Sequence, residues 1–172
     1  NWMKVHEQEM DSPLFEDMEN LRPVIPAGSS DSAALDSVFE LLNISGQPAP
    51  LAKLMLIPDA WSKKSKTLSK DHQQLFNFLN STMEPWDGPA AIAGTDNEWV
   101  IAATDRNGLR PMRYTITKDK ILCAGSETGM VELDEKKIIT KGRLGPGEII
   151  GVRIEKGKVF TNSQIKDFLA KE

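Results

Sequence analysis

The stretch AAIAGTDNEWVIAAT, residues 90–104, carries a pattern that predicts the fold of this chain. Two short apolar runs, Ala90–Gly94 and Trp99–Thr104, lie on either side of the turn signal Asp96-Asn97. Short runs of apolar and β-branched residues separated by turn residues are typical of antiparallel hairpins. The stretch therefore predicts the first hairpin of an antiparallel sheet.

Similar short runs, separated by further turn signals, continue through the second half of the chain. They are Met112–Thr117, Ile121–Gly125, Val131–Leu133, Ile138–Thr140, Ile149–Ile154 and Lys158–Thr161. The first half has a different pattern, in which Leu35, Val38, Phe39 and Leu42 recur at helical spacing. Helices followed by a meander of strands indicate an α+β fold with an antiparallel sheet. We expect helices in residues 1–86 and mainly antiparallel strands in residues 87–172.

The composition is that of a globular domain and argues against several classes of function. The net charge is −4, whereas a nucleic-acid-binding surface needs a basic excess or stripe. The densest basic run, Lys63-Lys64-Ser65-Lys66, has no interleaved aromatic residues, so we interpret it as a solvated loop. No apolar run approaches the ~20 residues of a membrane helix. We expect no nucleic-acid partner and no membrane partner.

Few residues of the usual catalytic types are present. The single cysteine, Cys123, lies in the apolar run Ile121–Ala124 and is interpreted as a buried, inert thiol. A single cysteine makes neither a disulfide framework nor a cysteine-rich metal site, which favours a reducing compartment. The two histidines, His6 and His72, are far apart in sequence, and we expect both at the surface. We therefore predict no metal site and no complete catalytic centre.

The stretch GSSDSAALD, residues 28–36, leads from a loop into a helix and allows two interpretations. Asp31 or Ser32 is suited to cap the helix. Asp31 is equally suited to bind a cationic ligand, because a helix N-terminus stabilises an ionised carboxylate. Local sequence does not choose between these roles, which are compatible with each other.

Several stretches, taken in order, resemble the amidotransferase domain of the large subunit of glutamate synthase. They are SDSAALD, MLIPDAW, MEPWDGPAA, DRNGLRPMRY and GRLGPGE, which begin at residues 30, 55, 83, 105 and 142. Together they extend over nearly the whole chain. The combination is specific, although an Asp-x-x-Gly-x-Arg-Pro turn also occurs in other class II glutamine amidotransferases.

The resemblance implies the later, C-terminal part of an N-terminal-nucleophile domain, an αββα sandwich of antiparallel sheets. In that family an N-terminal cysteine attacks the side-chain amide of L-glutamine, with its own α-amino group as the base. The released ammonia passes to a synthase domain, which adds it to 2-oxoglutarate to make glutamate. FMN and an iron–sulfur cluster are expected in the rest of the parent enzyme and none in this segment. The implied role is ammonia assimilation in the cytoplasm, or in the plastid of a photosynthetic eukaryote.

The resemblance also assigns roles to individual residues. Asp31 corresponds to the aspartate that binds the α-ammonium of glutamine, with Ser30 and Gly28 shaping its loop. Asp105, Arg106 and Arg110 are expected to have a structural role near the active-site sheet. Ser126 and Glu127, in AGSETG, are further candidates because the family has this loop close to the same sheet.

The chain departs from the family pattern at its start, where Asn1 stands and no N-terminal cysteine is present. The upstream arginine and Asn-Gly motifs of the family are absent as well. We therefore expect a processed chain or a piece of a longer one, which lacks the nucleophile and does not hydrolyse glutamine by itself. Its partners would be the missing N-terminal half and the synthase domain. The alternative is a non-catalytic module, derived from that domain, that binds an amino acid or a partner chain.

Overall fold

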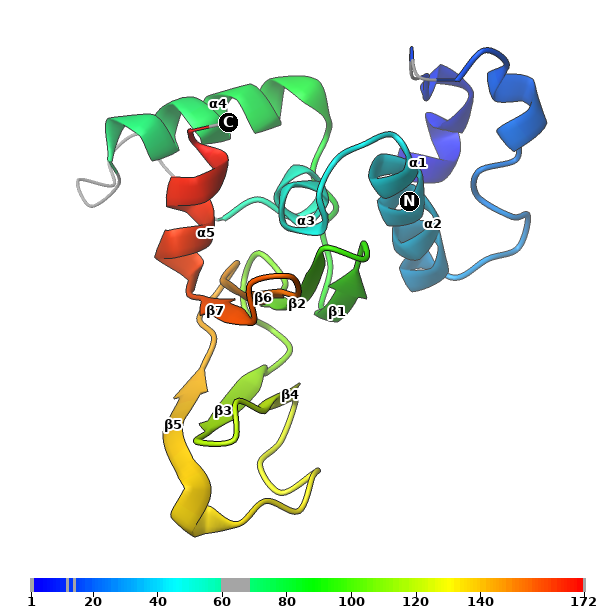
Figure 1. Cartoon of the computed structure of the whole chain (residues 1–172). Helices are drawn as coiled ribbons and strands as arrows, with labels where there is room; N and C mark the ends of the chain where they lie inside the picture. The colour runs from blue at the N-terminus through cyan, green and yellow to red at the C-terminus, as the bar shows by residue number, and fades with distance from the viewer. Residues whose placement is uncertain (1, 12, 14, 60–68, 172) are drawn as a thin grey trace.

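The computed structural model describes residues 2–11, 13, 15–59 and 69–171 (Figure 1). The basic run at residues 63–66 lies outside the described residues. The helices are α1 (Trp2–Val5), η1 (Glu7–Glu9), η2 (Met18–Leu21), α2 (Asp31–Ile44), α3 (Ala49–Leu56), α4 (Lys70–Thr82), η3 (Glu135–Lys137) and α5 (Asn162–Leu169). The strands are β1 (Ala91–Thr95), β2 (Trp99–Thr104), β3 (Arg113–Thr117), β4 (Leu122–Gly125), β5 (Ile138–Arg143), β6 (Ile149–Arg153) and β7 (Lys158–Phe160).

The larger sheet has four antiparallel strands in the order β1-β2-β6-β7. The hairpin predicted from residues 90–104 is confirmed, with Ile92 opposite Ala103. Its turn is closed by Asp96, whose Oδ1 accepts the backbone N–H of Trp99 at 2.7 Å. Asn97 has a φ of 73°, a left-handed conformation that asparagine adopts more readily than most residues.

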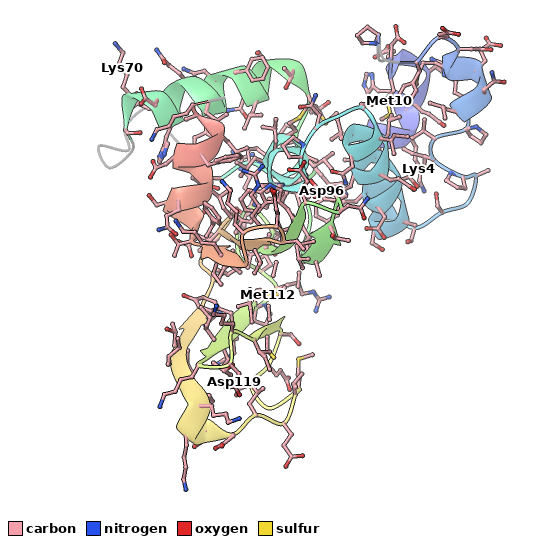
Figure 2. All side chains as sticks on the ribbon, viewed as in Figure 1. Lys4, Met10, Lys70, Asp96, Met112 and Asp119 are labelled. Atoms are coloured by element: carbon pink, nitrogen blue, oxygen red, sulfur yellow. The ribbon has the colours of Figure 1, made fainter. Side chains whose placement is uncertain are left out.

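The smaller sheet has three antiparallel strands in the order β4-β3-β5 and extends away from the larger sheet (Figure 1). Met112 lies between the two sheets, where it packs with Leu144 against Ala102 and Ile150 (Figure 2). The strand predicted at Val131–Leu133 is wrong, because these residues form no strand. Val131 is half exposed, and a run of three residues buries too little apolar surface to add a strand to the edge.

Helices cover one face of the larger sheet and enclose the main core. The alternation of side chains along β2 directs Trp99, Ile101 and Ala103 toward this face, where α3, α4 and α5 supply Leu54, Phe76 and Ile165. A second cluster joins α2 to α3 through Leu35, Val38 and Leu56. The helical pattern predicted around Leu35 is therefore confirmed, as is the α+β class with antiparallel sheets.

The prediction that both histidines lie at the surface is wrong for His72. Its side chain is buried between α4 and α5, and its Nε2 lies 2.8 Å from Oδ1 of Asp167. His6 is half buried, and its Nδ1 lies 2.6 Å from Oε2 of Glu9. No helix within the described residues has both the length and the apolar character needed to cross a membrane.

Candidate functional site

The loop before α2 is shaped by local hydrogen bonds. Gly28 has a φ of 76°, which lets the chain turn so that the backbone N–H of Ser29 donates to the carbonyl of Pro26 at 3.2 Å. Lys4, from α1, donates through its Nζ to the carbonyl of Ser29. A side chain at Gly28 would touch nothing within 4 Å, so this glycine serves the turn and not a close approach.

The cap of α2 is Ser30, and this corrects the sequence-based assignment to Asp31 or Ser32. The Ser30 hydroxyl accepts the backbone N–H of Ala33 at 3.2 Å and lies 3.1 Å from the hydroxyl of Ser32. Asp31 occupies the first position of the helix and is exposed. Among the described residues, its carboxylate has no hydrogen-bond or ion-pair partner. Asp31 is therefore available for a ligand, at a position where the helix dipole stabilises its negative charge.

Asp31 borders a cavity of about 500 Å³, which we call the Asp31 cavity. Its lining comes from the start of α2, the segment that enters β1 and one side chain of the β2–β3 loop: Asp31, Ser32, Leu35, Asp36, residues 86–93 and Arg110. Gly28 and Ser30 are not part of this lining. Their contribution is to the turn and to the cap that present Asp31.

The charged groups of the Asp31 cavity favour a cationic ligand. Its lining carries three carboxylates, those of Asp31, Asp36 and Asp87, and one guanidinium, that of Arg110. An ammonium group gains charge-assisted hydrogen bonds from such carboxylates. Nowhere in the described part of the chain do three or more His, Cys, Asp or Glu side chains come together to hold a metal ion. The arrangement suits an ammonium that enters together with an anionic group near Arg110.

One wall of the cavity is built by the MEPWDGP stretch. The backbone N–H of Trp86 donates to the carbonyl of Leu56 at 2.7 Å, and the indole is buried in the cluster that joins α2 and α3. Gly88 has a φ of 151°, and a Cβ there would lie 2.9 Å from Cη2 of Trp86. The backbone of residues 86–88 thus folds closely over its own indole, which requires a glycine at residue 88.

A second part of the lining depends on Asp105, whose carboxylate is buried and organises the turn of residues 105–110. Its Oδ1 accepts the backbone N–H groups of Asn107 and Leu109, each at 3.0 Å. Its Oδ2 accepts those of Arg110 at 3.0 Å and Ala90 at 3.2 Å. Burial raises the pKa of Asp105, but these N–H bonds outweigh it and hold the pKa below its ordinary value. The carboxylate therefore stays ionised and ties the turn to the start of β1.

Arg110 has a position that the sequence reasoning missed. We expected a structural role for it together with Asp105 and Arg106, yet its exposed side chain borders the Asp31 cavity. Ser126 and Glu127 lie in the loop after β4, in the smaller sheet, and neither is among the residues that line the cavity. The Ser126 hydroxyl lies 3.9 Å from the sulfur of Met130. Cys123, predicted to be buried, is half buried in β4.

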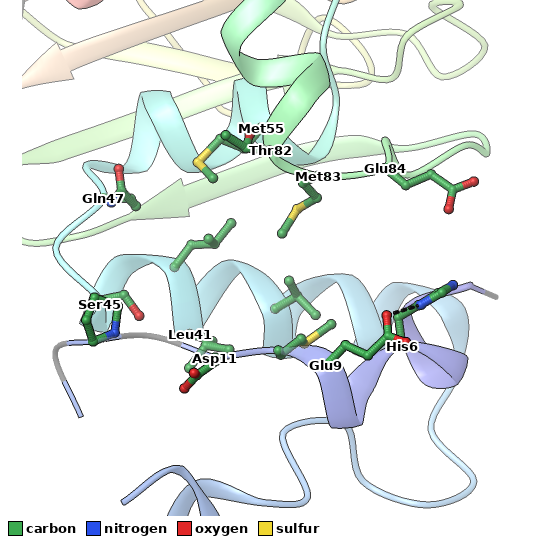
Figure 3. Close-up of a pocket in the computed structure, with 14 residues that line it drawn as sticks. His6, Glu9, Asp11, Leu41, Ser45, Gln47, Met55, Thr82, Met83 and Glu84 are labelled. Carbon is green, nitrogen blue, oxygen red and sulfur yellow. Dashed lines mark hydrogen bonds and ion pairs between the residues drawn. The ribbon is translucent and has the colours of Figure 1, made fainter. Parts of the chain in front are cut away.

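A larger cavity, of about 590 Å³, lies where the N-terminal segment meets α2, α3 and the end of α4 (Figure 3). Apolar side chains such as Leu41, Met55 and Met83 line much of it, and the His6–Glu9 pair lies at one side. Asp31 is not part of this lining. Its lining also includes the acidic residues Glu9, Asp11 and Glu84. Among the described residues that line it there is no arginine or lysine for an anionic group, whereas Arg110 lines the Asp31 cavity.

Comparison with known proteins identifies the family of the chain. The profile of the class-II glutamine amidotransferases matches residues 1–172. The chain belongs to this family. Its relatives include the large chain of NADPH glutamate synthase from Azospirillum brasilense, 53% identical over 99% of this chain. The corresponding large chain from Bacillus subtilis is 38% identical over 100% of this chain. The chloroplastic ferredoxin-dependent glutamate synthase 2 of Arabidopsis thaliana is 40% identical over 99% of it.

This class-II amidotransferase chain spans 11% of the length of each of these three relatives. The names of these relatives differ in giving NADPH or ferredoxin. The family that the motif order predicted from sequence is thereby confirmed.

Proposed function

We propose that this chain is part of the glutaminase domain of a glutamate synthase and that it supplies the site for the α-ammonium of L-glutamine. The observation that carries the proposal is the Asp31 carboxylate, which lines a cavity at a helix N-terminus and is not used as the cap. The names of the relatives support the parent enzyme. Asp31 binds the ammonium, Ser30 holds the helix start, and Gly28 provides the turn before it.

In the proposed reaction, water replaces the side-chain amide of glutamine, which leaves glutamate and ammonia. The nucleophile is a cysteine supplied by the N-terminal half of the domain, and the ammonia passes to the synthase domain to react with 2-oxoglutarate. FMN and an iron–sulfur cluster in the rest of the parent enzyme would carry the two reducing electrons, which a nicotinamide or ferredoxin supplies. An iron–sulfur cluster needs several thiolates, and Cys123 is the single cysteine here, so the residues of this chain do not fit that cluster.

The enzyme is proposed to act in ammonia assimilation in the cytoplasm. A plastid location applies if the source is a photosynthetic eukaryote, as the names of some relatives suggest. The partners of this segment are the N-terminal half of its own domain and the synthase domain. Within that assembly, the segment orients glutamine by its α-ammonium, while the nucleophile comes from the other half.

The test is the substitution Asp31→Asn in the full-length enzyme. Loss of one charge-assisted hydrogen bond, worth about 1.5–3 kcal/mol, raises the KM for glutamine by roughly 10- to 100-fold. The matched control is Glu40→Gln, which removes an exposed carboxylate from the same helix, away from the cavity. Glutamate synthesis from supplied ammonia bypasses the glutaminase site and should be unchanged in both variants.

A glutamine KM that is the same in the Asp31→Asn and Glu40→Gln enzymes would contradict the proposed role of Asp31. A full-length protein that binds glutamine but releases no ammonia would instead support the non-catalytic binding module.

A further inference from the structure

Lys53 is a buried lysine in the middle of α3, in the otherwise apolar run Leu51–Ile57. Its side chain is 1% exposed, and its Nζ donates to the carbonyl of Gly147 at 2.6 Å. The side chain also lines a small cavity of about 30 Å³, together with Leu35, Asp36, Ile92 and Ala93. The same four residues line the Asp31 cavity. Lys53 therefore lies beside residues that also line the Asp31 cavity.

The surroundings of Lys53 make its charge costly. Burial lowers the pKa of Lys53 to about 8, although the carboxylates of Asp59, Asp105 and Glu148 favour the charged form. The positive charge of Lys166, a second buried lysine, lowers the pKa of Lys53 further. A well-packed apolar side chain would avoid this cost, and exchanges of buried charges for apolar residues are often neutral or stabilising. Stability alone therefore gives no reason for a lysine at this position.

Gly147 connects Lys53 to the turn of residues 105–110. Its backbone N–H donates to the carbonyl of Asp105 at 2.8 Å. The two loops also pack closely, because a Cβ at Gly108 would lie 3.0 Å from Pro146. A Cβ at Gly147 would in turn lie 3.0 Å from the backbone of Asp59. The loop of residues 145–148, held by Lys53, therefore fixes the position of Asp105.

Asp105 extends this connection to the wall of the Asp31 cavity. Asp105 and Ala90 exchange two hydrogen bonds, from the Asp105 N–H to the Ala90 carbonyl at 3.0 Å and from the Ala90 N–H to Oδ2 at 3.2 Å. The same Oδ2 accepts the N–H of Arg110 at 3.0 Å. Ala90 and Arg110 both line the cavity. A shift of Gly147 is thus passed to two lining residues through hydrogen bonds of ordinary length.

We propose that Lys53 is a positioning residue for the glutamine site, which acts through Gly147 and the Asp105 turn to fix the wall that carries Ala90 and Arg110. This role rests on the proposed binding of glutamine in the Asp31 cavity. The lysine does not touch the substrate. It fixes the position of lining residues that border the same cavity as Asp31.

The test compares the full-length enzyme with its Lys53→Met and His72→Met variants. Methionine fills a similar space to lysine but donates no hydrogen bond. His72 is the matched control because it is also a buried polar side chain, and its hydrogen bond to Asp167 joins α4 to α5 without involving the loop of residues 145–148. The Lys53→Met enzyme should keep its melting temperature and show a KM for glutamine raised by about tenfold, from a slightly displaced wall. Its kcat and its ammonia-dependent synthesis should be unchanged.

Hydrogen exchange gives a readout that does not depend on glutamine. The amides of Leu109 and Arg110 should exchange faster in Lys53→Met than in the parent enzyme, and at the parent rate in His72→Met. Parent values of both KM and exchange in Lys53→Met would overturn the proposal, as would an equal rise of KM in His72→Met. If Asp31→Asn leaves the KM unchanged, the glutamine site itself is wrong, and the exchange comparison still decides whether Lys53 positions the turn.

Thr104→Val covers the case in which Lys53→Met does not fold. The Thr104 hydroxyl donates to the carbonyl of Gly145 at 2.6 Å, so valine releases the same loop with little change of shape. A KM raised by several-fold supports the relay through this loop. An unchanged KM in the folded Thr104→Val enzyme contradicts it.

Discussion

Replacing Asp105 with asparagine removes one of the two oxygens that organise the turn of residues 105–110. The carboxylate accepts four backbone N–H bonds, two at each oxygen. An amide keeps one acceptor oxygen, so two of these bonds are lost and two N–H groups face an NH₂ donor. At about 1.5–3 kcal/mol for each bond to a charged acceptor, the turn loses roughly 3–6 kcal/mol.

Hydrogen exchange in the intact protein measures this loss directly. A change of 1.4 kcal/mol corresponds to about a tenfold change in the opening equilibrium. The two amides that lose their acceptor oxygen should therefore exchange about 100-fold faster. The matched control is Asp134→Asn, where an exposed carboxylate accepts the backbone N–H of Lys136 at 3.0 Å. In the control, faster exchange should be confined to its own short helix, η3. Parent rates at Ala90, Asn107, Leu109 and Arg110 in Asp105→Asn would refute this reasoning.

Acid provides a second measurement on Asp105. Burial raises its pKa, but the backbone N–H bonds outweigh this and hold it below the ordinary 3.8. Because the folded pKa is lower than the unfolded one, the contribution to stability is fully present above 3.8 and disappears as the pH falls through the folded value. The Asp105→Asn protein should lack this component of acid sensitivity in denaturation curves.

Three other substitutions test separate parts of the account. Gly88→Ala places a Cβ 2.9 Å from Trp86 at a residue with a φ of 151°. We expect a lower melting temperature and a weaker affinity for glutamine, and an unchanged melting temperature would contradict the close packing. Ser30→Ala removes the bond to the N–H of Ala33 and should destabilise the fold by about 1 kcal/mol in urea unfolding, whereas no change would mean that another group caps α2. Lys53→Met tests how the titration of Lys53 affects stability. The pKa of Lys53 is about 8 in the folded protein and 10.5 in the unfolded chain, so between these values the unfolded chain binds a proton that the folded chain lacks. The free energy of unfolding of the parent should therefore rise by roughly 3 kcal/mol as the pH rises through this range. The Met variant should lose that gain, and identical pH profiles of the two proteins would contradict the burial of a titrating lysine.

The elements that sequence predicted well are those specified by neighbouring residues. The hairpin of residues 90–104 follows from two apolar runs and one turn, and α2 follows from Leu35 and Val38 at helical spacing. The order of the family motifs predicted Asp31 as a ligand residue, and its place in the cavity agrees with that prediction without testing it. Local information failed even here at the cap, because Ser30, Asp31 and Ser32 are all suitable caps and the backbone conformation selects Ser30.

The features that sequence missed depend on partners far along the chain. The hydrogen bond of Lys53 reaches a carbonyl 94 residues away, and the buried His72 pairs with Asp167, 95 residues further along the chain. Nothing in the local pattern of either residue indicates such a partner. Arg110 was assigned only a structural role for the same reason, since its place in the lining of the Asp31 cavity depends on how the Asp105 turn packs against Ala90.

The most direct test of the glutamine site is a crystal structure of the full-length enzyme with L-glutamine bound and the upstream nucleophilic cysteine replaced. In that structure the α-ammonium nitrogen should lie about 3 Å from a carboxylate oxygen of Asp31, within the Asp31 cavity. A glutamine whose ammonium is held by other residues, with Asp31 facing solvent, would contradict this prediction.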